Sequence, residues 1–149
     1  MLHMLRPFVL VLLVSGLAVA ALAQTPPSKP SLPERIKAQR WQKRVVVLYA
    51  PTAESAELRQ QKASMSAAQA QMQDRDILVI EAIEASLNPR EKQYVRQTLG
   101  VEPGSFAVVL LGKDGGVKRK ETEPIDPKAL FQTIDTMPMR RQEMREKGR

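Results

Sequence analysis

The segment Arg44–Ala50, which reads RVVVLYA, decides how the rest of the chain is organised. An unbroken apolar run follows Arg44, begins with three valines, and is stopped by Pro51. A β-branched run without polar alternation is typical of a strand that is buried on both faces. Because such a strand needs helices above and below its sheet, this segment predicts an α/β domain.

Three more strands are predicted further along the chain. The runs 76–83 (DILVIEAI) and 106–111 (FAVVLL) are again rich in β-branched residues. The sequence KDGG at 113–116 contains Asp-Gly, a strong signal for a hairpin turn, so 117–121 is expected to return as a fourth strand. Three consecutive basic residues in that last strand suit an exposed sheet edge, where charge discourages pairing with another chain.

Helices are predicted between and after these strands. Residues 53–72 are strong helix formers without Gly or Pro, and Thr52 is expected to cap this helix. Asx-Pro helix starts open two more helices, over 88–100 and 126–137. The predicted order is therefore β-α-β-α-β-β-α, a mixed four-stranded sheet with helices on both faces.

The first 23 residues predict export. A short basic segment precedes an apolar run, and Ala21-Leu22-Ala23 forms a small-x-small cleavage site. The apolar run is shorter than the roughly 20 residues of a spanning helix. We therefore expect a signal peptide cleaved after Ala23, a periplasmic or secreted bacterial protein, and no transmembrane segment after cleavage. An uncleaved anchor is the alternative.

Charge divides the rest of the chain into three parts. Residues 24–40 are rich in proline and predict a basic tether, 41–138 the folded domain, and 139–149 a basic tail. The chain carries a net charge of +7, yet acidic residues outnumber basic ones between 45 and 136. Since the positive charge belongs to the flanks of an exported protein, we expect no nucleic-acid partner.

The absence of cysteine excludes thiol redox chemistry, and the only histidine, His3, lies in the predicted signal peptide. Thiol nucleophiles, Cys/His zinc sites and histidine-based triads are therefore excluded from the mature chain. We expect no cofactor and no metal. Carboxylate, serine or lysine chemistry is still open, but Glu81 and Glu84 are expected to point to opposite faces rather than form an acid–base pair.

The element order and two segments resemble the thioredoxin-like fold. Residues 47–56 (VLYAPTAESA) resemble the strand and helix start of thioredoxin, with Ala53 and Ala56 where the two cysteines would be. Residues 100–106 (GVEPGSF) are similar to the segment that carries the thioredoxin cis-proline, although Pro103 lies about one residue early. The resemblance implies a degenerate redox site. The candidate binding residues are Thr52, Ala53, Ser55, Ala56 and Ser105.

A free helix start of this kind suits a small anion or a peptide carboxylate, and the alternative is an ordinary capped helix.

More specifically, the chain resembles the domain of unknown function 4174 family of exported bacterial proteins. The resemblance rests on Arg40-Trp41, the strand 45–51, the segment 106–118 (FAVVLLGKDGGVK) and the segment 134–140 (IDTMPMR). That family has no established activity, so the resemblance implies a fold and a compartment without a mechanism.

Three functions are compatible with these features. The leading interpretation is a non-catalytic binding or scaffold module that contacts an unknown envelope protein. The alternatives are an enzyme that uses carboxylate, serine or lysine groups, and an electrostatic binder of anionic envelope surface through the basic flanks. Trp41, the only tryptophan, is interpreted as a lid on one edge of the core, and an exposed anchor for a partner is the alternative.

Overall fold

The computed structural model describes residues 29–148, so the predicted signal peptide lies outside the described residues. Four strands form one sheet in the order β2-β1-β3-β4. Strand β1 pairs parallel with β2 and antiparallel with β3, which in turn pairs antiparallel with β4. The predicted mixed four-stranded sheet is confirmed. The strands are β1 (Arg44–Ala50), β2 (Ile77–Ile83), β3 (Ala107–Leu111) and β4 (Val117–Glu121).

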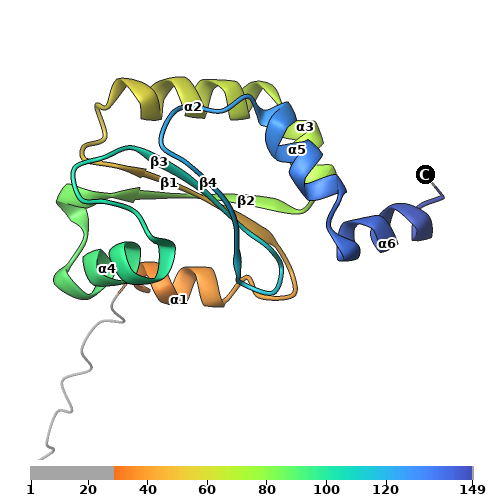
Figure 1. Cartoon of the computed structure of the whole chain (residues 1–149), viewed down its shortest axis with the longest axis horizontal. Helices are drawn as coiled ribbons and strands as arrows, with labels where there is room; N and C mark the ends of the chain where they lie inside the picture. The colour runs from red at the N-terminus through yellow and green to blue at the C-terminus, as the bar shows by residue number, and fades with distance from the viewer. Residues whose placement is uncertain (1–28, 149) are drawn as a thin grey trace, which may run out of the picture.

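Helices cover both faces of the sheet (Figure 1). One face carries α2 (Ala56–Ala67), α3 (Gln69–Asp74) and α5 (Pro127–Asp135). The other carries α1 (Leu32–Lys37), α4 (Pro89–Tyr94) and the π-helical turn Val95–Leu99, and a short 3-10 turn, Glu84–Ser86, follows β2. A further helix, α6 (Pro138–Glu146), projects from the end of α5. No helix within 29–148 is long and apolar enough to cross a bilayer.

Strand β1 separates two apolar cores. Val45, Val47 and Tyr49 pack with α1 and the π-helical turn, whereas Val46 and Leu48 pack with α2, α3 and α5. Successive side chains of a strand point to opposite faces, so every residue of this apolar run is buried. The expectation of a strand buried on both faces is confirmed.

Two of the predicted helix starts are confirmed by their capping bonds. The Asn88 side chain accepts the Glu91 N–H at 3.0 Å, and the Asp126 side chain accepts the Lys128 N–H at 2.9 Å. Gly100 ends its helix with φ 67°, the left-handed conformation that glycine adopts readily.

The single helix predicted over 53–72 is wrong in detail. Helix α2 begins at Ala56, and the helical path is broken at Ala68, where φ is −103°. Met65 and Met72 lie on either side of this break, and both are buried against the sheet. Met65 and Met72 therefore reach the same core from two separate helices.

The packed region extends beyond 41–138 at both ends. Leu32 and Ile36 of α1, inside the predicted tether, are part of one core. The predicted basic tail instead forms α6, in which Arg140 is only 2% exposed. Net charge alone suggested a solvated tail, but Arg140 is held by Asp74, which is 66 positions away in the sequence, as well as by the nearby Asp135.

Candidate functional site

The predicted binding residues at the start of α2 form a turn. Ser55, not Thr52, occupies the N-cap position, because helix α2 begins one residue later at Ala56. The Thr52 N–H donates to the Ser55 hydroxyl at 3.4 Å, and Ala53 lies within the turn that joins them. Thr52 was expected as the cap, but three residues separate it from Ala56, and no side chain makes a capping bond at this helix start.

Ser105 is held in a turn of its own, since its hydroxyl donates to the Glu102 carbonyl at 2.6 Å. Neither Ser105 nor the four residues of the α2 start line any of the cavities described below. An anion or carboxylate site at these five residues stays a prediction.

A tyrosine–carboxylate pair that sequence reasoning missed lies at the same end of the sheet. The Glu84 carboxylate accepts the Gly104 N–H at 2.8 Å and interacts with the Tyr49 hydroxyl. Burial and the Glu84 charge raise the pKa of Tyr49, while the Gly104 N–H and the Tyr49 hydroxyl lower the pKa of Glu84. Both shifts move away from neutrality, so this pair ties β2 to the loop before β3 and does not exchange protons near pH 7.

Glu81 lies apart from that pair and is bound by Lys62 of α2 at 2.7 Å. Glu81 and Glu84 thus have different partners in the structure, and the expectation that they form no acid–base pair stays a prediction.

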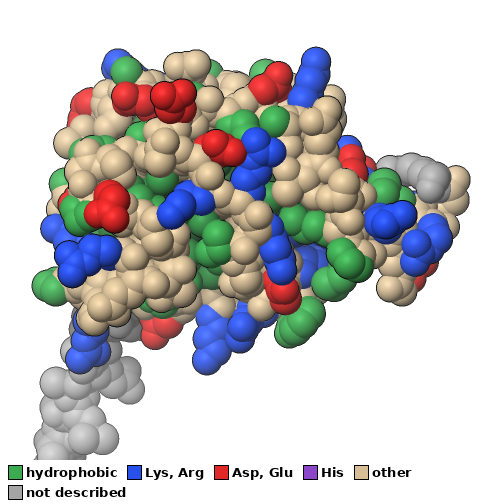
Figure 2. Space-filling model, viewed as in Figure 1, with side chains coloured by type: hydrophobic (Ala, Val, Ile, Leu, Met, Phe, Trp, Pro, Cys, Tyr) green, Lys and Arg blue, Asp and Glu red, His purple; other side chains and the backbone are tan. Residues whose placement is uncertain are grey.

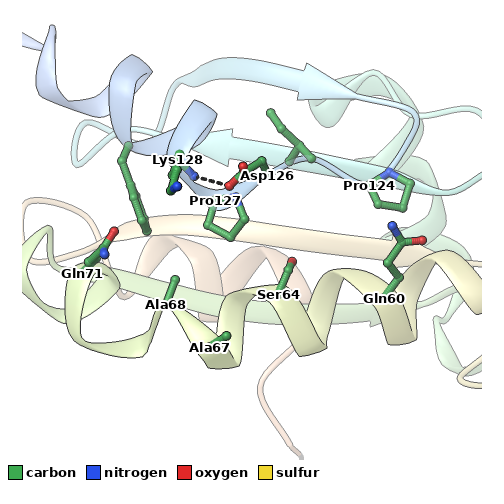
Figure 3. A pocket seen from close by; sticks show the side chains of 11 residues that line it. Gln60, Ser64, Ala67, Ala68, Gln71, Pro124, Asp126, Pro127 and Lys128 are labelled. Carbon is green, nitrogen blue, oxygen red and sulfur yellow. Dashed lines mark hydrogen bonds between the residues drawn. The ribbon is translucent and has the colours of Figure 1, made fainter.

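The largest described cavity, about 530 Å³, separates α2 and α3 from the start of α5. Figure 3 shows Gln60, Ser64 and Gln71 on one wall, with Asp126 and Lys128 on the other. Asp126 caps α5, and the Ser64 hydroxyl donates to the Gln61 carbonyl of its own helix at 2.9 Å. The Ser64 hydroxyl and the Asp126 carboxylate both make hydrogen bonds within helices. They therefore do not form a nucleophile and base pair in this cavity.

A second cavity, of about 360 Å³, lies at the opposite end of the sheet from the α2 start. Its lining combines one aromatic ring, two thioethers and several charged groups. The lining residues are Trp41, Arg44, Gly112, Lys113, Asp114, Lys118, Met137, Pro138 and Met139. These residues come from the α1–β1 loop, the β3–β4 hairpin and the start of α6. We call this surface the Trp41 site.

Trp41 is held in an unusual backbone conformation at this site. Its φ is 65°, a left-handed value that is costly for a bulky residue. The Trp41 N–H donates to the Lys113 carbonyl at 2.7 Å, and the neighbouring Arg40 Nε donates to the Asp114 carbonyl at 3.2 Å. These bonds fix the loop on the hairpin and present the indole outward.

The Trp41 side chain is 66% exposed, so the interpretation of Trp41 as a lid on the core is wrong. Met139 beside it is also among the exposed large apolar residues. Figure 2 shows hydrophobic side chains protruding at this end of the molecule, next to basic ones. A rigidly placed and exposed indole is the residue type that most often anchors a protein partner.

An ion-pair network forms the floor of the Trp41 site. The Arg44 side chain is 1% exposed, and its two terminal nitrogens donate to the Glu143 carboxylate. Lys113 Nζ bridges Glu143 at 2.8 Å and Asp76 at 3.0 Å. Burial raises the pKa of Glu143, but the hydrogen bonds and charges of Arg44 and Lys113 outweigh it and lower that pKa.

One donor of this network has no partner. Arg44 Nε is buried and makes no hydrogen bond to any group within the described residues. Buried donors of folded proteins are almost always satisfied, so this unpaired group is an exception among the described residues. Three basic residues and one acidic residue line this cavity, which favours an anionic acceptor.

In the sequence, Arg40-Trp41 and 134–140 are separate segments of the family resemblance, and nothing there joins them into one site. Three of the segments on which the family resemblance rests supply this one site: Arg40-Trp41, the end of 106–118, and 134–140. Their sequence separation hides the juxtaposition, which the β1–β3 pairing creates.

Comparison with known proteins supports the assignment of family and fold. A family model described as domain of unknown function (DUF4174) matches residues 35–143. The sushi repeat-containing protein SRPX of Rattus norvegicus is 29% identical over 113 residues, which are 68% of this chain and 24% of that protein. The chain therefore spans about a quarter of the length of this curated relative.

Two solved structures share the fold at low sequence identity. The reduced 2-Cys peroxiredoxin of Plasmodium vivax has a TM-score of 0.55 and 11% identity, over 71% of this chain and 83% of its own. The thioredoxin peroxidase I of Plasmodium yoelii has a TM-score of 0.53 and 12% identity, over 76% of this chain and 80% of its own. They confirm the predicted thioredoxin-like fold. With this fold and the family match over most of its length, the chain belongs to the family described as domain of unknown function DUF4174.

Proposed function

We propose that this protein is a non-catalytic binding module of the bacterial envelope, and that it contacts a partner protein through the Trp41 site. The observation that carries the proposal is the exposed Trp41 indole, fixed over a cavity by the Lys113 carbonyl at 2.7 Å. A left-handed tryptophan is costly, and binding offers a reason for its retention.

The chemistry of the Trp41 site supports binding over catalysis. Burial raises the pKa values of Asp76 and Glu143, yet their basic partners hold both below their ordinary range. Both carboxylates are therefore ionised at neutral pH and neutralise Arg44 and Lys113 instead of moving protons. The chain has no cysteine, and its only histidine precedes Ala23.

The ligand that fits this site combines an apolar side chain with a carboxylate. Trp41, Met137 and Met139 offer polarisable apolar surface, and thioethers adapt to irregular partners. Lys118 is more than one-third exposed and already pairs with Asp114 at 2.7 Å, so it offers an adjustable charge at the rim. We infer that the partner presents an acidic and apolar segment.

Two further observations support an exported module. Residues 1–23 have the composition of a signal peptide. A related sequence forms about a quarter of a longer protein named for its sushi repeats, and reuse as one part of a larger chain is expected of a binding module. The basic flank is less suited to anionic surfaces than its composition suggests, because Arg140 of α6 and Lys147, the residue that follows α6, both bind Asp74.

Site-specific photo-crosslinking tests the proposal. The full chain with its own leader is produced in its native host with a benzophenone amino acid at position 139, in the same site as the intact Trp41, or at the exposed Gln97 as the matched control. We expect a discrete crosslinked partner in the periplasmic fraction from position 139 only. The charge reversal Lys118→Glu should reduce its yield several-fold. Retention in the cytoplasm, or identical products from both positions, would contradict the proposal.

A further inference from the structure

The two edges of the sheet are built differently. The edge strand β4 carries Lys118, Arg119 and Lys120, and its register with β3 is irregular between Leu110 and Leu111. Both features discourage pairing with another chain. The opposite edge strand, β2, has the sequence ILVIEAI and a regular seven-residue register with β1. It contains no proline and no basic residue, so it lacks the protection that β4 has.

The side chains of β2 are incompletely covered on both faces. Leu78 is 37% exposed, and a cavity of about 290 Å³ separates it from α1. On the other face, a cavity of about 210 Å³ lies between Val79, Glu81 and the α2–α3 helices. The helices therefore leave room beside β2 on both faces, as a strand added at this edge requires.

We propose that β2 pairs antiparallel with β2 of a second copy of this chain and joins two four-stranded sheets into one of eight strands. A two-fold axis through this edge makes the interface self-complementary. The unprotected strand on one edge, opposite a basic and irregular one, favours pairing through a single edge. A closed dimer is therefore expected rather than a filament.

The sequence of β2 is suited to antiparallel pairing with the same strand of a second copy. With Ile80 opposite Ile80 of the second copy, Leu78 faces Ala82 and Ile77 faces Ile83. Glu81 then faces Val79, so no two like charges stand directly opposite each other. Each Glu81 keeps the Lys62 of its own chain as its partner, at 2.7 Å, and brings no unpaired charge into the interface.

Sedimentation of the full mature chain, up to its solubility limit, tests this proposal. We expect a reversible monomer–dimer equilibrium. Leu78→Lys should raise the dimer dissociation constant at least about a hundredfold, because a charge must then be buried at the edge. Val117→Lys is the matched control: Val117 is an apolar residue of β4 with 42% exposure, and its substitution should leave the constant unchanged.

Hydrogen exchange on the unmodified chain tests the same interface without any substitution. Protection of β2 amides should increase with protein concentration, while protection of β4 amides should not. A chain that is monomeric at every concentration would overturn the proposal. Equal weakening of the dimer by Leu78→Lys and Val117→Lys, or concentration-dependent protection confined to other elements, would overturn it as well. None of these results bears on the Trp41 site, which lies on other residues.

Discussion

The guanidinium of Arg44 donates hydrogen bonds to both carboxylate oxygens of Glu143, at 3.2 and 3.1 Å. This contact joins the first residue of β1 to α6 across 99 positions of sequence. Arg44 is buried, and Arg140 of α6, also buried, donates to Asp74 and to Asp135. Arg140 is the buried residue of α6, so ion pairs hold this helix on the rest of the domain.

Removal of the Glu143 charge should destabilise the fold. Glu143→Gln leaves the buried Arg44 without a counter-ion, and loss of one partner of a buried pair costs about 3 kcal/mol at the lower end of its usual range. The measurement is urea unfolding followed by circular dichroism. Glu146→Gln, an exposed position of the same helix, is the control and should stay within about 0.5 kcal/mol of the unmodified chain. Similar effects of both substitutions would show that the network adds no stability.

The stability of α6 should decrease in acid. Burial raises the pKa of Asp135, but Arg75 and Arg140 lower it below the ordinary value of 3.8. Burial likewise raises the pKa of Glu143, but Arg44 and Lys113 lower it below the ordinary value of 4.5. A carboxyl whose pKa is lowered by folding stabilises the folded state at pH values above its pKa in the unfolded chain. This stabilisation is lost as the pH falls through its pKa in the folded protein. We therefore expect full stability above about pH 5 and a progressive loss below pH 4. Thermal unfolding measured across this range checks the slope, which Glu143→Gln should flatten.

Ile36 tests the N-terminal limit of the domain. Its side chain lies in the core although the composition of 24–40 predicts a tether, so Ile36→Ala should cost about 2–4 kcal/mol. Lys37→Ala, one residue further along α1 and exposed, should change stability by less than about 0.5 kcal/mol. Urea unfolding of both variants distinguishes a packed helix from a tether, for which the two changes would be equally small.

The start of α2 should retain the electrostatics of a helix N-terminus. A thiol introduced by Ala56→Cys occupies the first helical position and should titrate below the free value of about 8.5, because the helix dipole favours the thiolate. A thiol introduced by Ala53→Cys lies in the preceding turn and should titrate close to that value. Both positions are exposed, so the thiolate absorbance of each variant can be followed directly. Identical titrations would refute a polarised helix start.

The sequence determined the elements whose signals are local. An apolar run places β1 between two cores, Asp114-Gly115 specifies the β3–β4 hairpin, and the Asn88 and Asp126 caps fix two helix starts. Each signal depends on neighbours within a few positions, so it survives without knowledge of the rest of the chain. The absence of cysteine likewise excludes thiol chemistry at the thioredoxin-like helix start, whatever the tertiary structure.

Only the tertiary structure decided the role of the flanks and the position of the candidate site. Arg44 and Arg140 have the sequence context of solvated charges, because each binds an acidic residue from a distant segment: Glu143 for Arg44 and Asp74 for Arg140. Trp41 and Met139 meet because antiparallel pairing of β1 with β3 brings the α1–β1 loop to the hairpin, where α6 begins. Burial and ion pairing depend on which surfaces the fold brings together. Neither the composition nor the periodicity of the sequence indicates which surfaces these are.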